Sequence, residues 1–326
     1  MRAFLVHDYG APSALKLEET PDPSPEAGEV ILDVEAAGLG YVDALLVAGR
    51  YQVKTPLPFI PGSEVAGRIS AVGEGVSEGL IGQDVMGLSP RGALAEKLAV
   101  PAAVCLSRPA GLSAEAAAGF LVSYCTALYG FKDCGALQPG ERVLVLGAAG
   151  GVGMAAIDLA KGMGAEVIAA ASTQEKRQAA IARGADFAID YTDHDWRKQL
   201  EPVTGRKDVD VVYDPVGGAH SETAFRCLAP GGRHLVVGFA AGEIPKLPLN
   251  LALLKRASLV GVDWGGHVRA DPTANAPLLK ELAVMISEGR ISPSADQVFP
   301  FEEAPDVLQR LLDRTSLGKP VIRVSA

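Results

Sequence analysis

Residues 143–154, which read VLVLGAAGGVGM, decide the fold of this chain. Apolar residues typical of a buried strand run into a glycine-rich turn, and a helical pattern starts directly after the turn. Such a turn lets the backbone approach a pyrophosphate closely and points the amides of a helix N-terminus at its charge. The strict G-x-G-x-x-G fingerprint is not met, because the turn reads A-x-G-x-x-G from Ala148. The stretch predicts the phosphate-binding turn of a dinucleotide site, with a strand–helix turn that binds no ligand as the alternative.

Strand and helix patterns alternate from Arg142 onward. Strands are predicted at residues 142–147, 166–171, 187–191, 209–213, 233–238 and 258–262, with helices at 152–163 and 174–183. Continuous apolar strands that alternate with helices indicate a parallel sheet covered on both faces. We therefore predict an α/β domain with six strands in this part of the chain.

The two flanking parts of the chain have a different pattern. Up to about residue 120, short strands such as 29–34, 64–72 and 93–100 are broken by Gly and Pro, which is typical of a small β-rich domain. The tail after about residue 275 adds two helical patterns, at 277–288 and 305–314, and two strands, at 297–301 and 319–324. Because β-rich pieces flank the α/β part on both sides, we expect the tail to return to the first domain. The predicted domains are residues 1–120 with 275–326, and residues 121–274.

Length, charge and cysteine spacing limit the class of protein. A chain of 326 residues is long enough for two domains with sizeable cores. Its formal net charge of -9, without a block of like charges, argues against nucleic acid as a partner. No apolar run reaches membrane-spanning length, the N-terminus lacks the features of a signal peptide, and the four cysteines lack CxxC spacing. We therefore expect a cytoplasmic protein with no membrane partner.

The end of the second predicted α/β strand indicates which nicotinamide cofactor binds. An NAD site places an Asp or Glu there, where the carboxylate accepts a hydrogen bond from the ribose 2′-hydroxyl. Here the strand ends Ala171-Ser172-Thr173, and Lys176 and Arg177 follow within a turn of helix. A hydroxyl with nearby cations suits a 2′-phosphate, so this end predicts NADPH. The alternative for the two cations is an ordinary solvated helix face.

Several motifs together resemble one protein family along nearly the whole chain. They are AGLGYVD at 37–43, AGRY at 48–51, PGSEVAG at 61–67, SYCTALY at 123–129 and AAGGVG at 148–153. The set is similar to the zinc-free quinone oxidoreductase (zeta-crystallin-like) branch of the medium-chain dehydrogenase/reductase superfamily. This resemblance implies a GroES-like β-rich domain joined to a Rossmann domain with a doubly wound parallel sheet. It also implies an active site in the cleft between them and a C-terminal return to the first domain.

The resemblance also bears on zinc. Zinc alcohol dehydrogenases of this superfamily carry a Cys shortly before an Asp, and a His just before a Glu. In this chain Gly40 precedes Asp43, and Ser63 precedes Glu64. A catalytic zinc needs thiolate or imidazole ligands, and two carboxylates alone make a poor site. We therefore predict no catalytic metal.

Without zinc, hydrogen-bond donors must stabilise the enolate-like oxygen that forms when hydride reaches a quinone or an enone. Tyr51 is the first candidate donor and Tyr41 the second, while Asp43 either orients its loop or contacts substrate. The alternative for both tyrosines is half-buried packing. Placement of the cofactor supplies much of the catalysis in such a site, so a single essential acid is not required.

The remaining candidates are expected to contact the cofactor. Thr126 would lie near the phosphates or the nicotinamide of the cofactor. The glycine-rich turn would offer amides to the pyrophosphate. Residues that follow later strands would line the adenosine and nicotinamide ends. The full set is Thr126, Ala149, Gly150, Gly151, Val152, Gly153, Ser172, Lys176, Tyr191, Gly238, Phe239, Ala240, Asp263, Trp264 and Lys319. Lys319 matches only loosely a basic position of the family near the 2′-phosphate.

The predicted function is NADPH-dependent hydride transfer to a quinone without zinc. A reductase of enals, enones or enoyl-CoA-type double bonds is the first alternative, because it would share the same turn. A non-enzymatic NADPH-binding protein, like relatives recruited as lens proteins, is the second.

The last α/β strand, at 257–262, would form an apolar sheet edge, and such edges tend to be paired. Because two such edges commonly meet in this family, we predict a homodimer.

Overall fold

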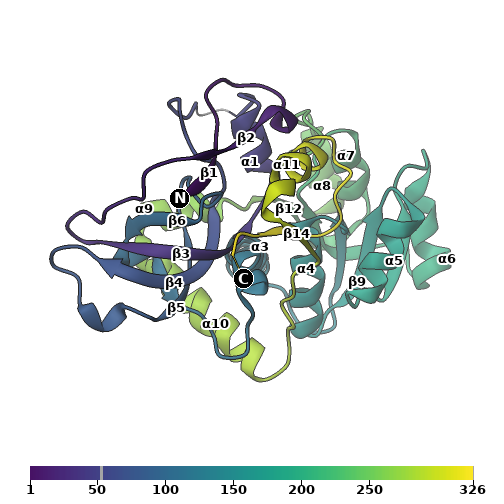
Figure 1. Cartoon of the computed structure of the whole chain (residues 1–326). Helices are drawn as coiled ribbons and strands as arrows, with labels where there is room; N and C mark the ends of the chain where they lie inside the picture. The colour runs from purple at the N-terminus through teal and green to yellow at the C-terminus, as the bar shows by residue number, and fades with distance from the viewer. Residues whose placement is uncertain (52–53, 326) are drawn as a thin grey trace. The chain divides into compact units, whose positions relative to one another are not determined.

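The computed structural model describes residues 1–51 and 54–325, and the chain divides into two compact units (Figure 1). The first unit comprises Met1–Leu121 and, after the chain returns, the residues from Pro293 onward. The second unit is Val122–Ser292. Within the part of the chain that the structure describes, no helix combines the length and the apolar character needed to cross a membrane.

The second unit contains a six-stranded sheet in which every neighbouring pair is parallel. In spatial order the strands are β10 (Phe187–Asp190), β9 (Glu166–Ala171), β8 (Arg142–Leu146), β11 (Val209–Asp214), β12 (Leu228–Val236) and β13 (Ser258–Gly261). The chain therefore moves outward from β8 to one edge, returns, and continues from β11 to the other edge. This reversal beside β8 is the arrangement of a Rossmann fold, in which ligands bind beyond the carboxyl ends of the strands. The predicted α/β class and parallel sheet are confirmed.

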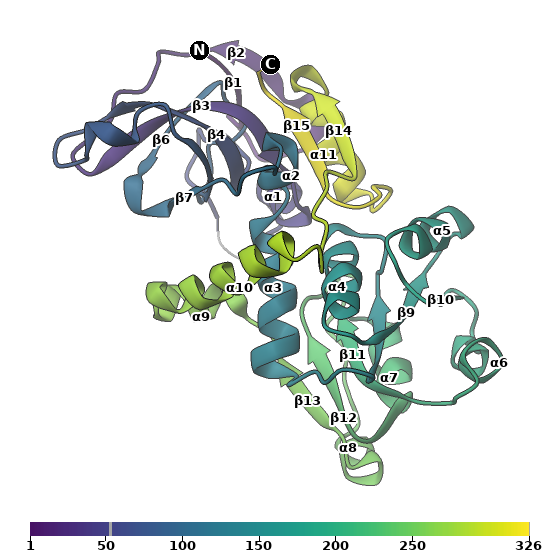
Figure 2. The same cartoon turned by 90° about the horizontal axis from the view of Figure 1, so that it is seen from below.

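Helices between the strands cover this sheet (Figure 2). The principal ones are α4 (Gly151–Gly162), α5 (Gln174–Ala182), α7 (Ala219–Arg226) and α8 (Leu249–Lys255). All five residues of β8 are buried, and Leu144 and Leu146 share a core with Ile168 of β9 and Phe225 of α7. Burial of such side chains stabilises a fold by about 1.5–3 kcal/mol each, so β8 is a well-fixed support for the turn that follows it.

The first unit is built on a seven-stranded sheet. Its strands are β3 (Glu29–Gly38), β4 (Glu64–Val72), β5 (Asp84–Leu88), β6 (Lys97–Pro101), β7 (Cys105–Ser107), β14 (Gln297–Pro300) and β15 (Pro320–Arg323). β3 pairs antiparallel with β4, β6 and β15, so the C-terminal strand completes a sheet begun near the N-terminus. Together with the α/β unit, this β-rich unit confirms the predicted fold class.

The predicted start of the C-terminal return, residue 275, lies too early. Helix α10 (Asn275–Ser287) belongs to the second unit, where Glu281 forms an ion pair with Lys132. Farther on, the Ser292 amide donates to Asp158 Oδ2 of α4 at 3.1 Å. The chain leaves the second unit only after this bond. An amphipathic helix next to a domain boundary does not reveal which core its apolar face joins.

Candidate functional site

The phosphate turn joins β8 to α4. Gly147 has a φ of +57°, a conformation that favours glycine, and its carbonyl accepts a hydrogen bond from the Gly150 amide at 2.9 Å. A Cβ atom on Gly153 would lie 2.4 Å from that same carbonyl oxygen, so a larger residue at 153 does not fit. The first amides of α4 have no acceptor within the helix, as at any helix N-terminus. The Gly151 and Val152 amides at this helix N-terminus therefore suit an anion, and their binding of a pyrophosphate stays a prediction.

A second group lies at the carboxyl ends of β9 and β10. Ser172 follows β9, and Thr173 caps α5 by accepting a hydrogen bond from the Lys176 amide at 3.2 Å. Arg177 binds Asp190, at the end of β10, with 2.8 Å between Nη1 and Oδ2. Arg177 was expected as a cation near a phosphate, and its pairing with Asp190 was not predicted.

The Tyr191 ring lies 4.5 Å from the His220 ring, measured between centroids, which adds a second aromatic residue to this end of the sheet. Burial lowers the pKa of His220, so the ring is held in its neutral form near neutral pH. No local pattern indicates this pairing, because the two residues are brought together only by the sheet.

Asp214, the last residue of β11, is a highly connected carboxylate of the second unit that was not among the predicted site residues. Its Oδ1 accepts hydrogen bonds from the amides of Val216 at 2.9 Å and Gly217 at 2.8 Å. Its Oδ2 accepts one from the Ser221 hydroxyl at 2.6 Å and lies 3.0 Å from His234 Nε2. Burial raises the pKa of Asp214, but these bonds outweigh burial and hold the pKa below its usual value.

The loop that Asp214 fixes touches the turns after two other strands. A Cβ atom on Gly147 would lie 2.7 Å from Val216 Cγ2, so the loop packs directly on the phosphate turn. On the other side, the Ala240 amide donates to the Pro215 carbonyl at 3.1 Å. The Gly238 amide donates to the Asp214 carbonyl at 3.3 Å. The turns after β8, β11 and β12 are thus one packed group.

Among the predicted cofactor residues, Phe239 lies in this group and is partly exposed. Asp263 and Trp264 have structural partners of their own. Asp263 caps α9 (Trp264–Ala270) by accepting from the Gly266 amide at 2.8 Å, and the buried Trp264 ring donates to Asn275 Oδ1 at 3.1 Å. Thr126 is half-buried on α3 (Leu121–Tyr129).

In the first unit, the predicted catalytic residues surround α1 (Tyr41–Val47). Tyr41 begins the helix and is half-buried, whereas Tyr51 follows it and is exposed. Asp43 is buried, and its Oδ2 accepts a hydrogen bond from the Gly40 amide at 2.7 Å. Burial is the main reason why the pKa of Asp43 is raised, although the Lys319 charge, the Gly40 amide and the Ser63 hydroxyl oppose it. Asp43 therefore fixes the start of α1.

Lys319 forms an ion pair that its loose match to a phosphate position did not indicate. Its ammonium group contacts the Glu64 carboxylate, and both side chains are buried in the first unit. Ser172, Lys176 and Tyr191, expected around the same phosphate, belong to the second unit. The ion pair joins residues 255 positions apart, so no local pattern could indicate it.

These residues do not fit a zinc ion. Gly40 and Ser63 supply neither thiolate nor imidazole, and the Glu64 carboxylate already faces an ammonium group. Across residues 1–51 and 54–325, His, Cys, Asp and Glu side chains form no group of three or more that could hold a metal ion.

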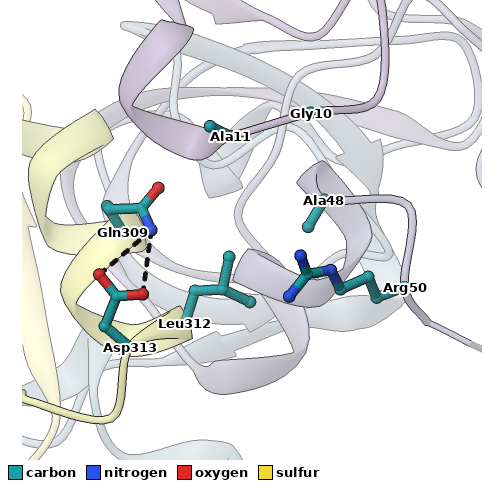
Figure 3. Close-up of a pocket in the computed structure, with 7 residues that line it drawn as sticks. All are labelled: Gly10, Ala11, Ala48, Arg50, Gln309, Leu312 and Asp313. Atoms are coloured by element: carbon teal, nitrogen blue, oxygen red, sulfur yellow. Dashed lines mark hydrogen bonds between the residues drawn. The ribbon is translucent and has the colours of Figure 1, made fainter.

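A pocket of about 250 Å³ opens beside the end of α1 in the first unit (Figure 3). Its lining residues are Gly10, Ala11, Ala48, Arg50, Gln309, Leu312 and Asp313. Gln309 Nε2 donates to both carboxylate oxygens of Asp313, at 3.1 and 3.2 Å. None of the predicted catalytic or cofactor residues is among the residues that line this pocket.

Comparison with known proteins agrees with this architecture. The family model "Alcohol dehydrogenase GroES-like domain" matches residues 26–110, and "Zinc-binding dehydrogenase" matches residues 151–281. Mouse quinone oxidoreductase-like protein 2 is 36% identical over 323 residues, which cover 98% of this chain and 91% of the mouse protein.

Two solved structures have the same fold. The quinone oxidoreductase of Thermus thermophilus, solved also as its complex with NADPH, is 36% identical with a TM-score of 0.80, covering 99% of this chain and 100% of that one. The CurK enoyl reductase is 27% identical with a TM-score of 0.87, covering 99% of both chains. Because relatives of this identity match both units along their length, the chain belongs to the zinc-free quinone oxidoreductase branch of the medium-chain dehydrogenase/reductase superfamily.

Proposed function

We propose that the protein, an oxidoreductase by family, uses NADPH to reduce a quinone without a metal ion. The observation that carries the cofactor assignment is the end of β9, which reads Ala171-Ser172-Thr173 without a carboxylate and is followed by Lys176. A 2′-phosphate suits a hydroxyl beside a cation, whereas the acidic residue of an NAD site would repel it. The relative from Thermus thermophilus, solved with NADPH, supports the same choice.

NADPH, when bound, supplies the hydride. The chain contributes position and charge. The amides at the start of α4, from Gly151 and Val152, would bind the pyrophosphate, and Ser172 and Lys176 would bind the 2′-phosphate. Asp214 would keep the turn at its binding geometry before the cofactor arrives, which reduces the ordering that binding must supply.

On the substrate side, a hydrogen-bond donor stabilises the negative oxygen that develops as a quinone is reduced. Tyr51 and Tyr41 are the proposed donors, and neither phenol is fully buried, so each can reach a ligand. Asp43 is buried and bound to Gly40. We therefore assign Asp43 to positioning α1, and not to contact with substrate.

Reduction of an activated carbon–carbon double bond is the second candidate function. The same turn and the same donors would serve an enal, an enone or an enoyl thioester, because each develops an enolate-like oxygen. The similarity to the CurK enoyl reductase favours keeping this candidate.

We also propose that the protein acts as a homodimer in a reducing compartment such as the cytoplasm. Three leucines of α8 are strongly exposed, namely Leu249 at 83%, Leu253 at 77% and Leu254 at 73%. Leu259, on the edge strand β13, is 53% exposed. An apolar surface beside an unpaired strand edge is what a second copy would cover. The four cysteines are free thiols, in keeping with a reducing compartment.

The proposed reaction is tested by following NADPH oxidation with an ortho-quinone, a simple enal and a crotonyl thioester in parallel, with NADH as the control donor. We expect rapid turnover of the quinone and a strong preference for NADPH. Turnover of the enal or the thioester with an inert quinone would transfer the function to double-bond reduction. Saturable NADPH binding without turnover of any substrate would support a non-enzymatic role.

The 2′-phosphate site is tested by Lys176→Ala. Loss of a charged hydrogen bond costs about 1.5–3 kcal/mol, so the KM for NADPH should rise roughly 10- to 100-fold while the KM for NADH stays the same. Lys207→Ala, which removes an exposed cation of the same unit, is the matched control and should change neither value. Equal effects of Lys176→Ala on the two cofactors would rule out a contact with the 2′-phosphate.

The dimer is tested by sedimentation of the double variant Leu253→Asp/Leu254→Asp. Charges in an apolar interface cost far more than at a free surface, so wild type should sediment as a dimer at micromolar concentration and the variant as a monomer. Ile181→Asp on α5, 43% exposed in the wild type, is the control and should remain dimeric. A monomeric wild-type protein would exclude the proposed assembly.

A further inference from the structure

Three ionisable side chains are gathered inside the first unit. Glu64, at the start of β4, is 1% exposed, Asp43 on α1 is 2% exposed, and Lys319, just before β15, is 8% exposed. The Lys319 ammonium group contacts the Glu64 carboxylate, and its charge also acts on Asp43. Buried ions are costly unless an opposite charge compensates them, so this cluster depends on the Lys319 cation.

The position of Gly40 shows what the ammonium group faces. A Cβ atom on Gly40 would lie 3.6 Å from Lys319 Nζ and 3.6 Å from Asp43 Oδ2, which are ordinary contact distances. Gly40 has a φ of −127° and a ψ of 169°, an extended conformation open to any residue. A side chain at position 40 would therefore fit, and it would begin beside the ammonium group. This is the position at which the zinc alcohol dehydrogenases carry a cysteine.

We propose that the Lys319 ammonium group is the resident cation of this site, in place of a metal ion. It compensates the buried Glu64 carboxylate, and its charge also acts on Asp43, whose Oδ2 accepts a hydrogen bond from the Gly40 amide. The same segment holds the sheet together, since the Leu39 amide donates to the Pro320 carbonyl at 3.0 Å. The Lys319 amide in turn donates to Asp296 Oδ2 at 2.9 Å.

The proposal goes beyond the reductase function, because it concerns the cation that this unit requires whichever substrate it meets. It has two consequences. With Lys319 in place, the site should reject a divalent cation, because like charges repel strongly where water is excluded. Without Lys319, the two carboxylates should accept another cation once suitable ligands are supplied. A thiolate and an imidazole are the ligands that zinc prefers.

Zinc stoichiometry tests both consequences. The forms compared are wild type, Gly40→Cys/Ser63→His, and Gly40→Cys/Ser63→His/Lys319→Ala, each stripped with a chelator, exposed to zinc, desalted and measured by atomic emission. We expect about one zinc per chain in the triple variant only, because four ligands then surround a site without its ammonium group. A zinc ion retained by wild type, or equally tight binding by the double variant with Lys319, would overturn the proposal.

Thermal unfolding tests whether the buried Glu64 carboxylate requires the Lys319 cation, without reference to zinc or to activity. Lys319→Met leaves the Glu64 carboxylate without the ammonium group and should lower Tm by roughly 10 °C, whereas Lys319→Arg should keep most of the stability. Adding Glu64→Gln to Lys319→Met should restore at least half of the lost Tm, because no buried carboxylate then remains at position 64. An unchanged Tm for Lys319→Met, or a double variant that is no more stable or does not fold, would contradict the proposal. Both readouts are independent of reductase activity, so failure of the proposed function would leave them unaffected.

Discussion

The hydrogen bonds to the buried Asp214 carboxylate are the interactions on which the proposed cofactor site of the second unit depends. One carboxylate oxygen accepts from the amides of Val216 and Gly217 in the loop after β11, and the other contacts Ser221 of α7 and His234 of β12. Through the loop that Asp214 fixes, the phosphate turn packs on one side and residues 238–240 on the other. The glycines give the turn its shape, but Asp214 gives it a fixed neighbour, which is what a preorganised binding site requires.

The first unit is organised by charge in a comparable way. There Lys319 compensates Glu64 within a buried cluster that also holds Asp43, and Asp43 in turn fixes the start of the helix that carries Tyr41. In each unit a buried charged group holds separate segments together, and in the first unit those segments are 255 residues apart. The side chains proposed to meet the cofactor or the substrate, namely Ser172, Lys176, Tyr41 and Tyr51, are more exposed than these buried groups, so support and contact are assigned to different residues.

Local patterns were sufficient for the elements of the fold and for part of the candidate site. The apolar run before Gly147, the glycines after it and the absence of a carboxylate after Ala171 are all visible within a few residues. The role of Lys319 was not, because its partner Glu64 lies in a strand brought close only by the folded sheet. Asp214 was missed for a related reason, since the sequence that follows it, Pro215-Val216-Gly217-Gly218, indicates a turn and not the carboxylate that holds the turn. The partner of a buried charge is therefore set by the folded structure, whereas turns and strands can be predicted from residues close together in the sequence.

If residues 143–154, held by Asp214, form an NADPH site, weakening the Asp214 contacts must weaken NADPH binding. The decisive quantity is the dissociation constant for NADPH, from the fluorescence of the bound nicotinamide, for wild type and Asp214→Asn. Asparagine keeps the shape of the side chain but replaces one acceptor oxygen with a donor, which costs about 1.5–3 kcal/mol for a bond to a charged group. We expect saturable binding by wild type and binding roughly 10- to 100-fold weaker by the variant, with unchanged circular dichroism. Equal affinities, or no saturable binding of NADPH by wild type, would contradict this assignment.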